Sequence, residues 1–310
     1  MITRYSSVAS TCRRLLARAR VADPIRAAVP LVVAAVLLLG AIGVAHANVD
    51  LVFGVYTSDK PVAMVNQLRP TLDLLETGAS ARLGEPVKIQ LRIFRDYQLG
   101  VASLVAGKID MARLGAASYV QAKSRAPEIE LLAAEKFGNS HYFEGVICVN
   151  AKSPIHSVAD LAGKTFAFGS KRSTIGRYLA QLYLAQHGIT ASKLAAFQYL
   201  ERHDRVGMAV GAGAFDAGAL EGTMFHKLVA AGVPIRAIAS FPNVTKAWVA
   251  RARLAPRVRE ALAHTLVTIS DPKALAALRF DGFVAVRDSD YDVTRTAIEK
   301  NAVFFDQSHP

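Results

Sequence analysis

The chain has 310 residues, of which 52% are hydrophobic and 20% are charged. This composition excludes an intrinsically disordered protein, and the length suffices for one large domain or two lobes. The formal net charge is +12, but the basic residues are scattered and are not interleaved with aromatic side chains. The charge pattern therefore argues against a nucleic-acid-binding protein and favours one that meets small anions.

The N-terminus has the pattern of a secretory signal. Six arginines precede an uncharged apolar run of 18 residues at 27–44, and the small residues Ala45 and Ala47 follow. This order predicts a signal peptide over residues 1–47, cleaved after Ala47, and a periplasmic mature protein that meets the membrane only through this segment. An uncleaved membrane anchor is the alternative, because 18 apolar residues just suffice to span a bilayer. The segment holds six Arg and one Asp, so its removal lowers the net charge from +12 to +7.

Past residue 47 the chain keeps a single cysteine, Cys148, within an apolar stretch. One cysteine can form neither an internal disulfide nor a cysteine-based metal site. We therefore predict a core position for Cys148, and neither a metal nor a cofactor.

Strand and helix patterns alternate along the mature chain. Strands are predicted, in chain order, at 50–56, 88–94, 108–115, 129–137, 145–150, 165–169, 215–220, 235–241 and 247–254. Apolar residues at spacings of three and four from Val65 to Ala79 predict a helix, in which Pro70 should cause a kink or a second start. Further helices are predicted between the strands and at 255–269 and 290–303. Strands separated by helices predict an α/β fold with largely parallel sheets.

Two extended stretches suggest how the chain divides. Residues 150–170 are predicted to leave one sheet and enter another, and residues 235–253 to return. This predicts a first lobe of residues 48–150 and 250–310, and a second lobe of residues 151–249. Two crossings between α/β lobes favour a ligand cleft between them.

Five stretches of the chain together resemble one protein family. They are VFGVYTSDKP, FRDYQLGVASLVAGKIDMARLGAASYV, SPIHSVADLAGKTFAFGS, RSTIGRYL and RHDRVGMAVGAGAFDAGALEG. Their order and spacing resemble the substrate-binding proteins of phosphonate, phosphite and phosphate-type ABC transporters, over residues 50–305. The resemblance implies a two-lobed type II periplasmic-binding-protein fold with mixed sheets, which closes around one oxyanion. It also implies an inner-membrane ABC permease as the partner.

The first candidate site is a Ser-Thr turn before a long helical pattern. Ser173 and Thr174 are ordinary helix caps, but a helix start also offers free N–H groups to an anion. The resemblance matches the family's serine-threonine turn to Ser173 and Thr174, its second-lobe histidine to His203 and its first-lobe tyrosine to Tyr97. Ile175 departs from the family's pattern, which has a further hydroxyl residue there.

Further contributors are predicted at loop starts and in one strand. Tyr56, Ser58 and Tyr119 are candidates for the cleft, with a core or capping role as the alternative. The family's second cleft aromatic falls on Tyr142 or on Phe143, and the sequence leaves this choice open.

The ligand is predicted from departures within the resemblance. Family members that bind aminoalkyl phosphonates hold the ammonium group with acidic residues, whereas the aligned positions here fall on Thr223 and near Lys246. A lysine would repel an ammonium group. We therefore predict a compact oxyanion such as phosphate, phosphite or methylphosphonate, with Glu221 as a further candidate for the cleft.

The predicted function is a non-catalytic periplasmic receptor that delivers a phosphorus oxyanion to an ABC importer. One alternative is a sensor that presents the bound ligand to a membrane signalling protein. A less favoured alternative is a hydrolase that uses Ser173 and His203, and the sequence has no G-x-S-x-G elbow around the serine.

Overall fold

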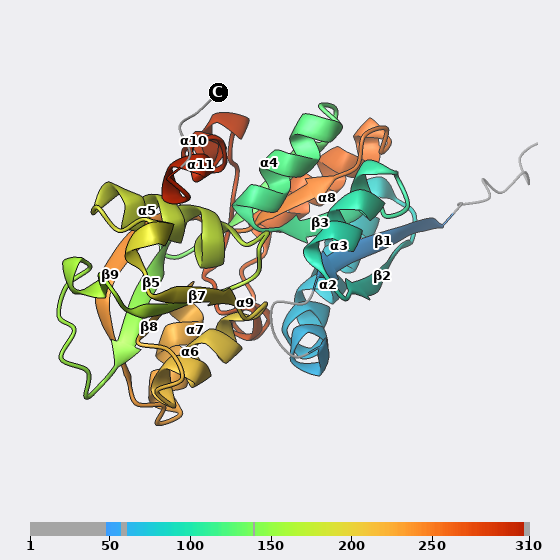
Figure 1. Cartoon of the computed structure of the whole chain (residues 1–310). Helices are drawn as coiled ribbons and strands as arrows, with labels where there is room; N and C mark the ends of the chain where they lie inside the picture. Colours follow the sequence, from blue (N-terminus) through green and yellow to red (C-terminus); the bar gives the residue numbers. More distant parts are fainter. Residues whose placement is uncertain (1–47, 57–60, 139, 307–310) are drawn as a thin grey trace, which may run out of the picture. The chain divides into compact units, whose positions relative to one another are not determined.

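The computed structural model describes residues 48–56, 61–138 and 140–306. The predicted signal peptide at 1–47 and the candidate Ser58 lie outside the described residues. The described residues form one compact unit, which contains two β-sheets flanked by helices (Figure 1). None of the helices in the described ranges is long and apolar enough to cross a membrane.

The first sheet has six strands in the order β11-β4-β10-β3-β1-β2. Its strands are β1 (Val49–Tyr56), β2 (Val87–Phe94), β3 (Met111–Leu114), β4 (Glu130–Lys136), β10 (Ala247–Ala250) and β11 (Gly282–Val284). β1 pairs in parallel with β2 and β3, whereas β10 runs antiparallel to β3 and β4.

Helices cover both faces of the first sheet. They are α2 (Pro61–Leu83), α3 (Tyr97–Val105), α4 (Ala116–Arg125), α8 (Pro256–Thr268) and α9 (Pro272–Leu278). Leu68 and Leu72 of α2 pack with Phe53 and Trp248 in one core, and Tyr97 on the other side belongs to a second core. Burial of these apolar faces is what holds the helices to the sheet. α2 is one helix across Pro70, so Pro70 does not mark a second start.

The second sheet has five strands in the order β7-β6-β8-β5-β9. Its strands are β5 (Tyr142–Asn150), β6 (Thr165–Phe168), β7 (Ala196–Tyr199), β8 (Ala217–Glu221) and β9 (Ile235–Val244). β6 pairs in parallel with β7 and β8, whereas β5 runs antiparallel to β8 and β9. Cys148 of β5 is fully buried, in agreement with its predicted core position.

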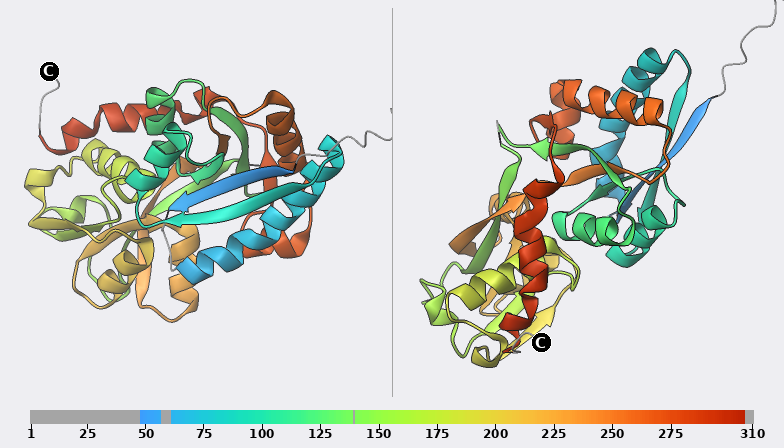
Figure 2. Two further views of the ribbon diagram at one scale, coloured as in Figure 1. Left: turned by 90° about the vertical axis from the view of Figure 1, so that its right-hand side faces the viewer. Right: turned by 90° about the horizontal axis from the view of Figure 1, so that it is seen from above.

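Two groups of helices flank this sheet. The elements are the π-helix η2 (Thr174–Leu179), α5 (Ala180–Gln186), α6 (His203–Gly211), α7 (Gly222–Ala230), α10 (Asp292–Glu299) and α11 (Asn301–Phe304). Short 3-10 turns complete the unit at η1 (Ala159–Leu161), η3 (Ala191–Lys193) and η4 (Asp288–Tyr291). Figure 2 shows the C-terminal helices, in red, running along the elements of the second sheet.

Sheet membership differs from the division of the chain that the sequence predicts. Strand β5 falls within the predicted first lobe, yet it lies in the second sheet between β8 and β9. Ala297 of α10 and Phe304 of α11 also fall in the predicted first lobe, but they pack into the core of the second sheet. A buried apolar strand needs hydrogen-bonding partners on both sides, and its sequence does not specify which sheet provides them.

The mixed α/β class and the alternation of strands with helices are confirmed. Parallel pairing is confined to β1, β2 and β3 and to β6, β7 and β8, so antiparallel pairing has a larger share than the sequence suggested. Helix α9 and the three-residue strand β11 were not predicted, because such short elements carry little periodicity.

Candidate functional site

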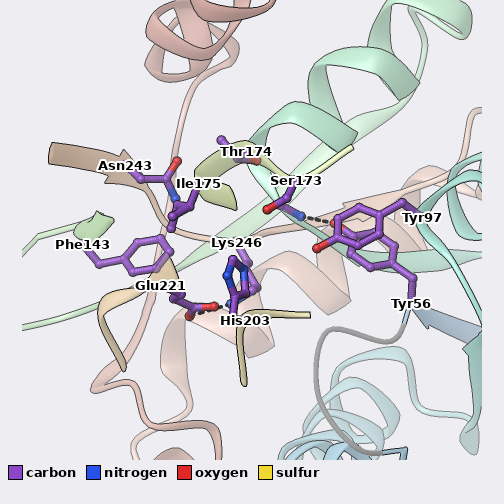
Figure 3. A pocket seen from close by; sticks show the side chains of 11 residues that line it. Tyr56, Tyr97, Phe143, Ser173, Thr174, Ile175, His203, Glu221, Asn243 and Lys246 are labelled. Carbon is purple, nitrogen blue, oxygen red and sulfur yellow. Dashed lines mark hydrogen bonds and ion pairs between the residues drawn. The ribbon is translucent and has the colours of Figure 1, made fainter. Parts of the chain in front are cut away.

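One pocket collects residues that follow the ends of strands in both sheets (Figure 3). It is lined by Tyr56, Tyr97, Gly115, Phe143, Ser173, Thr174, Ile175, His203, Glu221, Asn243 and Lys246. Tyr56 ends β1 and Glu221 ends β8, while Gly115 directly follows β3. The carboxyl ends of parallel strands are where open α/β sheets commonly bind ligands. The topology thus brings together segments that lie far apart in the sequence.

The Ser-Thr turn is held from two sides. Ser173 is the N-cap of η2, and its Oγ accepts a hydrogen bond of 3.0 Å from Gly176 N. Thr174 Oγ1 accepts one of 2.8 Å from Ala117 N, at the start of α4. Since Thr174 Oγ1 acts as an acceptor in this bond, its hydroxyl hydrogen remains available for donation into the pocket.

Two glycines, Gly169 and Gly176, allow this turn to pack closely against the end of β6. A Cβ on Gly176 would lie 2.8 Å from the Cα of Gly169, which is closer than real Cβ contacts come. The two backbones are joined by a bond of 2.8 Å from Gly169 N to Gly176 O. This close approach fixes the position of the turn against the end of β6.

Two stacked tyrosines form the wall on the side of the first sheet. The rings of Tyr56 and Tyr97 are 3.9 Å apart between centroids. The Tyr56 hydroxyl accepts from Gly115 N at 2.7 Å and donates to Ser118 Oγ at 3.0 Å. Burial raises the pKa of Tyr56 and of Tyr97 above the usual value for a phenol. Both side chains therefore stay neutral at physiological pH, and Tyr97 can act as a hydroxyl donor.

His203 opens α6 and is buried beside the pocket. Burial lowers its pKa, although the neighbouring Glu221 carboxylate opposes this shift. The imidazole is therefore neutral at neutral pH and carries one N–H. Its Nδ1 is buried without a hydrogen-bond partner among the described residues. Asp204, the acid beside it, pairs with Arg202 at 2.6 Å and so does not orient the imidazole.

An ion pair occupies the far side of the pocket. Lys246 Nζ lies 3.0 Å from Glu221 Oε1, and both side chains are largely buried. Thr223 Oγ1 donates to the same oxygen at 3.0 Å. Burial alone would raise the pKa of Glu221, but the Lys246 ammonium and His203 outweigh it and lower this pKa to about 2. Glu221 therefore remains a carboxylate throughout the physiological range.

The structure brings most of the candidate residues together, and it places two of them elsewhere. The candidates that line the pocket are Ser173, Thr174, His203, Tyr97, Tyr56 and Glu221. Ser58 lies outside the described residues.

Tyr119 and Tyr142 are the two that lie apart. Tyr119 is fully buried in a core of the first sheet, where its hydroxyl donates to Asp288 and its ring packs on Tyr291. Tyr142 is 43% exposed, whereas the next residue, Phe143, lines the pocket. Neighbouring residues of a strand point to opposite faces, so only one of these two aromatics can reach the pocket.

Sequence reasoning missed Asn243. Its side chain is 3% exposed, lines the pocket, and has an Oδ1 without a partner among the described residues. The sequence around it, FPNV, has the composition of a turn. In the structure this stretch instead continues β9 as far as Val244.

A family model described as "ABC transporter, phosphonate, periplasmic substrate-binding protein" matches residues 53–291. The chain belongs to this family. Members of the phosphonate-binding family are periplasmic binding proteins rather than enzymes, in agreement with the predicted class.

Similar proteins are known from several bacteria. A relative from Prochlorococcus marinus (strain MIT 9301), described as a probable ABC transporter phosphite binding protein, PhnD1, is 27% identical over 191 residues. The match covers 55% of this chain and 63% of the relative, so it spans less than two thirds of that protein.

The fold is shared with solved structures of other proteins. That of PhnD1 in complex with methylphosphonate has a TM-score of 0.71 at 21% identity, covering 82% of this chain and 98% of that one. A binding-protein component of an ABC phosphonate transporter from Pseudomonas aeruginosa has a TM-score of 0.70 at 18% identity, covering 82% and 87%. These likenesses show the periplasmic-binding-protein fold.

Proposed function

We propose that this chain is the solute-binding component of an ABC importer, and that it captures a phosphorus oxyanion in the pocket described above. The observation that carries the proposal is the convergence of neutral donors from both sheets. Tyr97 lies on one side, and the Ser173-Thr174 turn and His203 lie on the other. Several neutral donors can bind an oxyanion without an ion pair, because each hydrogen bond to a charged acceptor is strong.

The ion pair supports a compact ligand. The Lys246 ammonium already forms an ion pair with the Glu221 carboxylate, and Thr223 has only a hydroxyl group with which to bind an ammonium group of the ligand. The ammonium group of an aminoalkyl phosphonate would thus meet the Lys246 ammonium at a position where binding requires a carboxylate. Two like charges about 4 Å apart cost on the order of 4 kcal/mol at an effective dielectric constant of 20. Phosphate, phosphite and methylphosphonate have no ammonium group and avoid this cost. Such ligands are supported by the PhnD1 relative, which is described as a probable phosphite binding protein and whose solved structure is a complex with methylphosphonate.

The proposed partner is an inner-membrane ABC permease, which receives the ligand from the closed binding protein. The family description, with its periplasmic substrate-binding role in ABC transport, supports this partner. Delivery of a bound solute requires no catalytic step, so we expect binding without turnover.

Calorimetry on ligand-free, refolded protein tests the proposal. Phosphate, phosphite, methylphosphonate and 2-aminoethylphosphonate are titrated in turn. We expect one of the three small oxyanions to bind at one site per protein, and 2-aminoethylphosphonate to bind at least about a hundredfold more weakly. Failure of all four ligands to bind would contradict the function. Comparable affinity for the aminoalkyl ligand would contradict the role given to Lys246.

A further inference from the structure

A second pocket adjoins the candidate site and shares His203, Glu221 and Lys246 with it. Since these three residues belong to both linings, a ligand bound in the candidate site can extend a substituent toward the second pocket. We call this second space the adjoining pocket. The residues that distinguish it from the candidate site include Arg113, Thr223, Met224 and Arg279. Their chemistry determines which kind of substituent the protein accepts.

Arg113, on β3, brings a buried cation to the adjoining pocket. Its side chain is 8% exposed, and its Nε and Nη2 both donate to the Glu135 carboxylate. The third nitrogen, Nη1, has no acceptor among the described residues, but it is not enclosed in the interior as an unpartnered buried atom would be. Nη1 therefore faces the pocket that Arg113 lines. A donor of a buried guanidinium that lacks an acceptor in the protein favours a ligand that supplies one.

The first turn of α7 adds backbone donors to the same pocket. This helix has nine residues, and its N-cap, Glu221, forms no side-chain hydrogen bond to the turn. Thr223 and Met224, both in the first turn, line the adjoining pocket. The uncapped N–H groups and the positive end of the helix dipole favour an anion at this position.

Arg279 gives the adjoining pocket an excess of positive charge. Of the other two cations in the lining, Lys246 is balanced by Glu221 and Arg113 by Glu135. Arg279 is the C-cap of α9, and its exposed side chain forms no ion pair within the described ranges. Its backbone is left-handed (φ 62°), a conformation in which glycine is the common choice at the end of a helix. One positive charge at the adjoining pocket thus remains without a counter-charge.

These donors distinguish between three kinds of substituent. An ammonium group would meet the positive charges of Lys246 and Arg279. An alkyl group would cover Arg113 Nη1 without giving it an acceptor, and a buried donor without an acceptor is costly. A carboxylate satisfies both demands, because a guanidinium group can donate two parallel hydrogen bonds to its two oxygens.

We infer that the adjoining pocket is a second anion subsite, and that this protein prefers small phosphonates whose substituent ends in a carboxylate or another small anionic group. The phosphonate group binds in the candidate site, and the acidic end of the substituent binds Arg113 and Arg279. The inference rests on the proposed function, because it assumes that a phosphorus oxyanion occupies the candidate site.

The first test compares ligands of the same shape on the unaltered, ligand-free protein. Phosphonoacetate and its homologue one carbon longer are titrated by calorimetry, each beside the uncharged alkyl phosphonate of the same branched shape. At least one acidic ligand should bind about tenfold or more tightly than its uncharged partner, as expected for a hydrogen bond between charged groups. This preference should shrink as the ionic strength rises, because Arg279 is exposed and salt screens its attraction.

The second test uses a matched pair of arginine variants. Arg279→Gln removes the uncompensated charge, so it should reduce the preference for the acidic ligand by several fold. Arg253→Gln is the control, since Arg253 is also exposed and left-handed (φ 64°) but lines neither pocket. It should keep the full preference. The ratio of the two affinities is measured in each variant, so a general loss of folded protein does not imitate the expected result.

The outcomes separate this inference from the proposed function. If phosphate, phosphite or methylphosphonate binds but neither acidic ligand is preferred over its uncharged partner, the anion subsite is wrong and the function stands. A preference that Arg279→Gln and Arg253→Gln reduce equally would also contradict the subsite. If no phosphorus oxyanion binds, the proposed function itself is wrong, and the inference with it.

Discussion

Thr174 connects the two sides of the pocket through one oxygen atom. Its Oγ1 accepts from Ala117 N on the side of the first sheet, while the residue itself lies in the turn after β6. Because the side chain is 6% exposed, a lost partner there is not readily replaced by water. In the proposed site one hydroxyl thus serves both the ligand and the contact between the sheets.

Thr174→Ala should weaken ligand binding by about tenfold or more, since a hydrogen bond to a charged ligand is worth about 1.5–3 kcal/mol. Thr174→Ser, which keeps the hydroxyl, should retain most of the affinity. Calorimetry with the best oxyanion measures both variants. Thr77→Ala, at an exposed position on α2, is the control and should bind normally. Unchanged affinity in Thr174→Ala would remove this residue from the site.

The ionisation of Glu221, in the pocket, should make the stability of the fold depend on pH in the acidic range. Its pKa is about 2 in the folded protein, against an ordinary value of 4.5. A carboxyl group with a lowered pKa stabilises the fold above its unfolded pKa, and this contribution is lost as the pH falls through the folded value. The Glu221 contribution should therefore be complete above pH 4.5 and should disappear between pH 4.5 and about 2.

The difference in unfolding free energy between the unaltered protein and Glu221→Gln measures this contribution. In urea titrations we expect the difference to be largest near neutral pH, on the order of 3 kcal/mol, and to shrink steadily below pH 4.5. A difference that stays constant through this range would show that the ion pair with Lys246 does not stabilise the fold.

At the scale of elements, the π-helix η2 gives the pocket its shape. The wider turn is closed by a bond of 3.3 Å from Tyr178 N to Ser173 O, and it packs directly on the end of β6. π-helical turns are rare and are found frequently at functional sites. Here the turn presents Ser173 and Thr174 to the pocket, and the contact between Gly169 and Gly176 supports it.

Gly176→Ala should therefore affect both stability and binding. The new Cβ would meet the backbone of Gly169, which cannot move aside as a side chain can. We expect a loss of about 1–3 kcal/mol in unfolding free energy and a clear loss of ligand affinity. Gly84→Ala is the control, since its φ of 71° makes alanine costly in open space far from the pocket. It should lose stability only, and ligand affinity that survives in Gly176→Ala would contradict the role of the glycine pair.

At the scale of the whole molecule, the described unit begins where the predicted signal peptide ends. The described residues begin at Asn48 and form one compact unit, in which strand β1 begins at Val49. Cleavage after Ala47 would therefore leave the first sheet intact. We predict that the exported protein starts at Asn48. N-terminal sequencing of protein from the periplasmic fraction tests this, and an exported chain that retains residues 1–30 would favour the membrane anchor instead.

Features that depend on neighbours along the chain could be predicted from the sequence alone. Alternation and helical spacing identified most strands and helices, because periodicity is a local property. The order of the family motifs pointed to Ser173, Thr174, His203 and Tyr97, and each of these residues sits at the start of a helix or turn. A helix start offers the same free N–H groups and caps in any fold, so candidate binding residues at helix starts can be predicted from the sequence alone.

Which of these segments contact one another became clear only from the three-dimensional fold. It placed β5 in the second sheet, Phe143 rather than Tyr142 at the pocket, and Tyr119 in a core away from it. It also paired Glu221 with Lys246, 25 positions later in the chain. Strand partners, burial and ion pairs result from the packing of distant segments, and the same local pattern is compatible with several such arrangements. For this reason the charge balance of the pocket follows from the fold and not from any single motif.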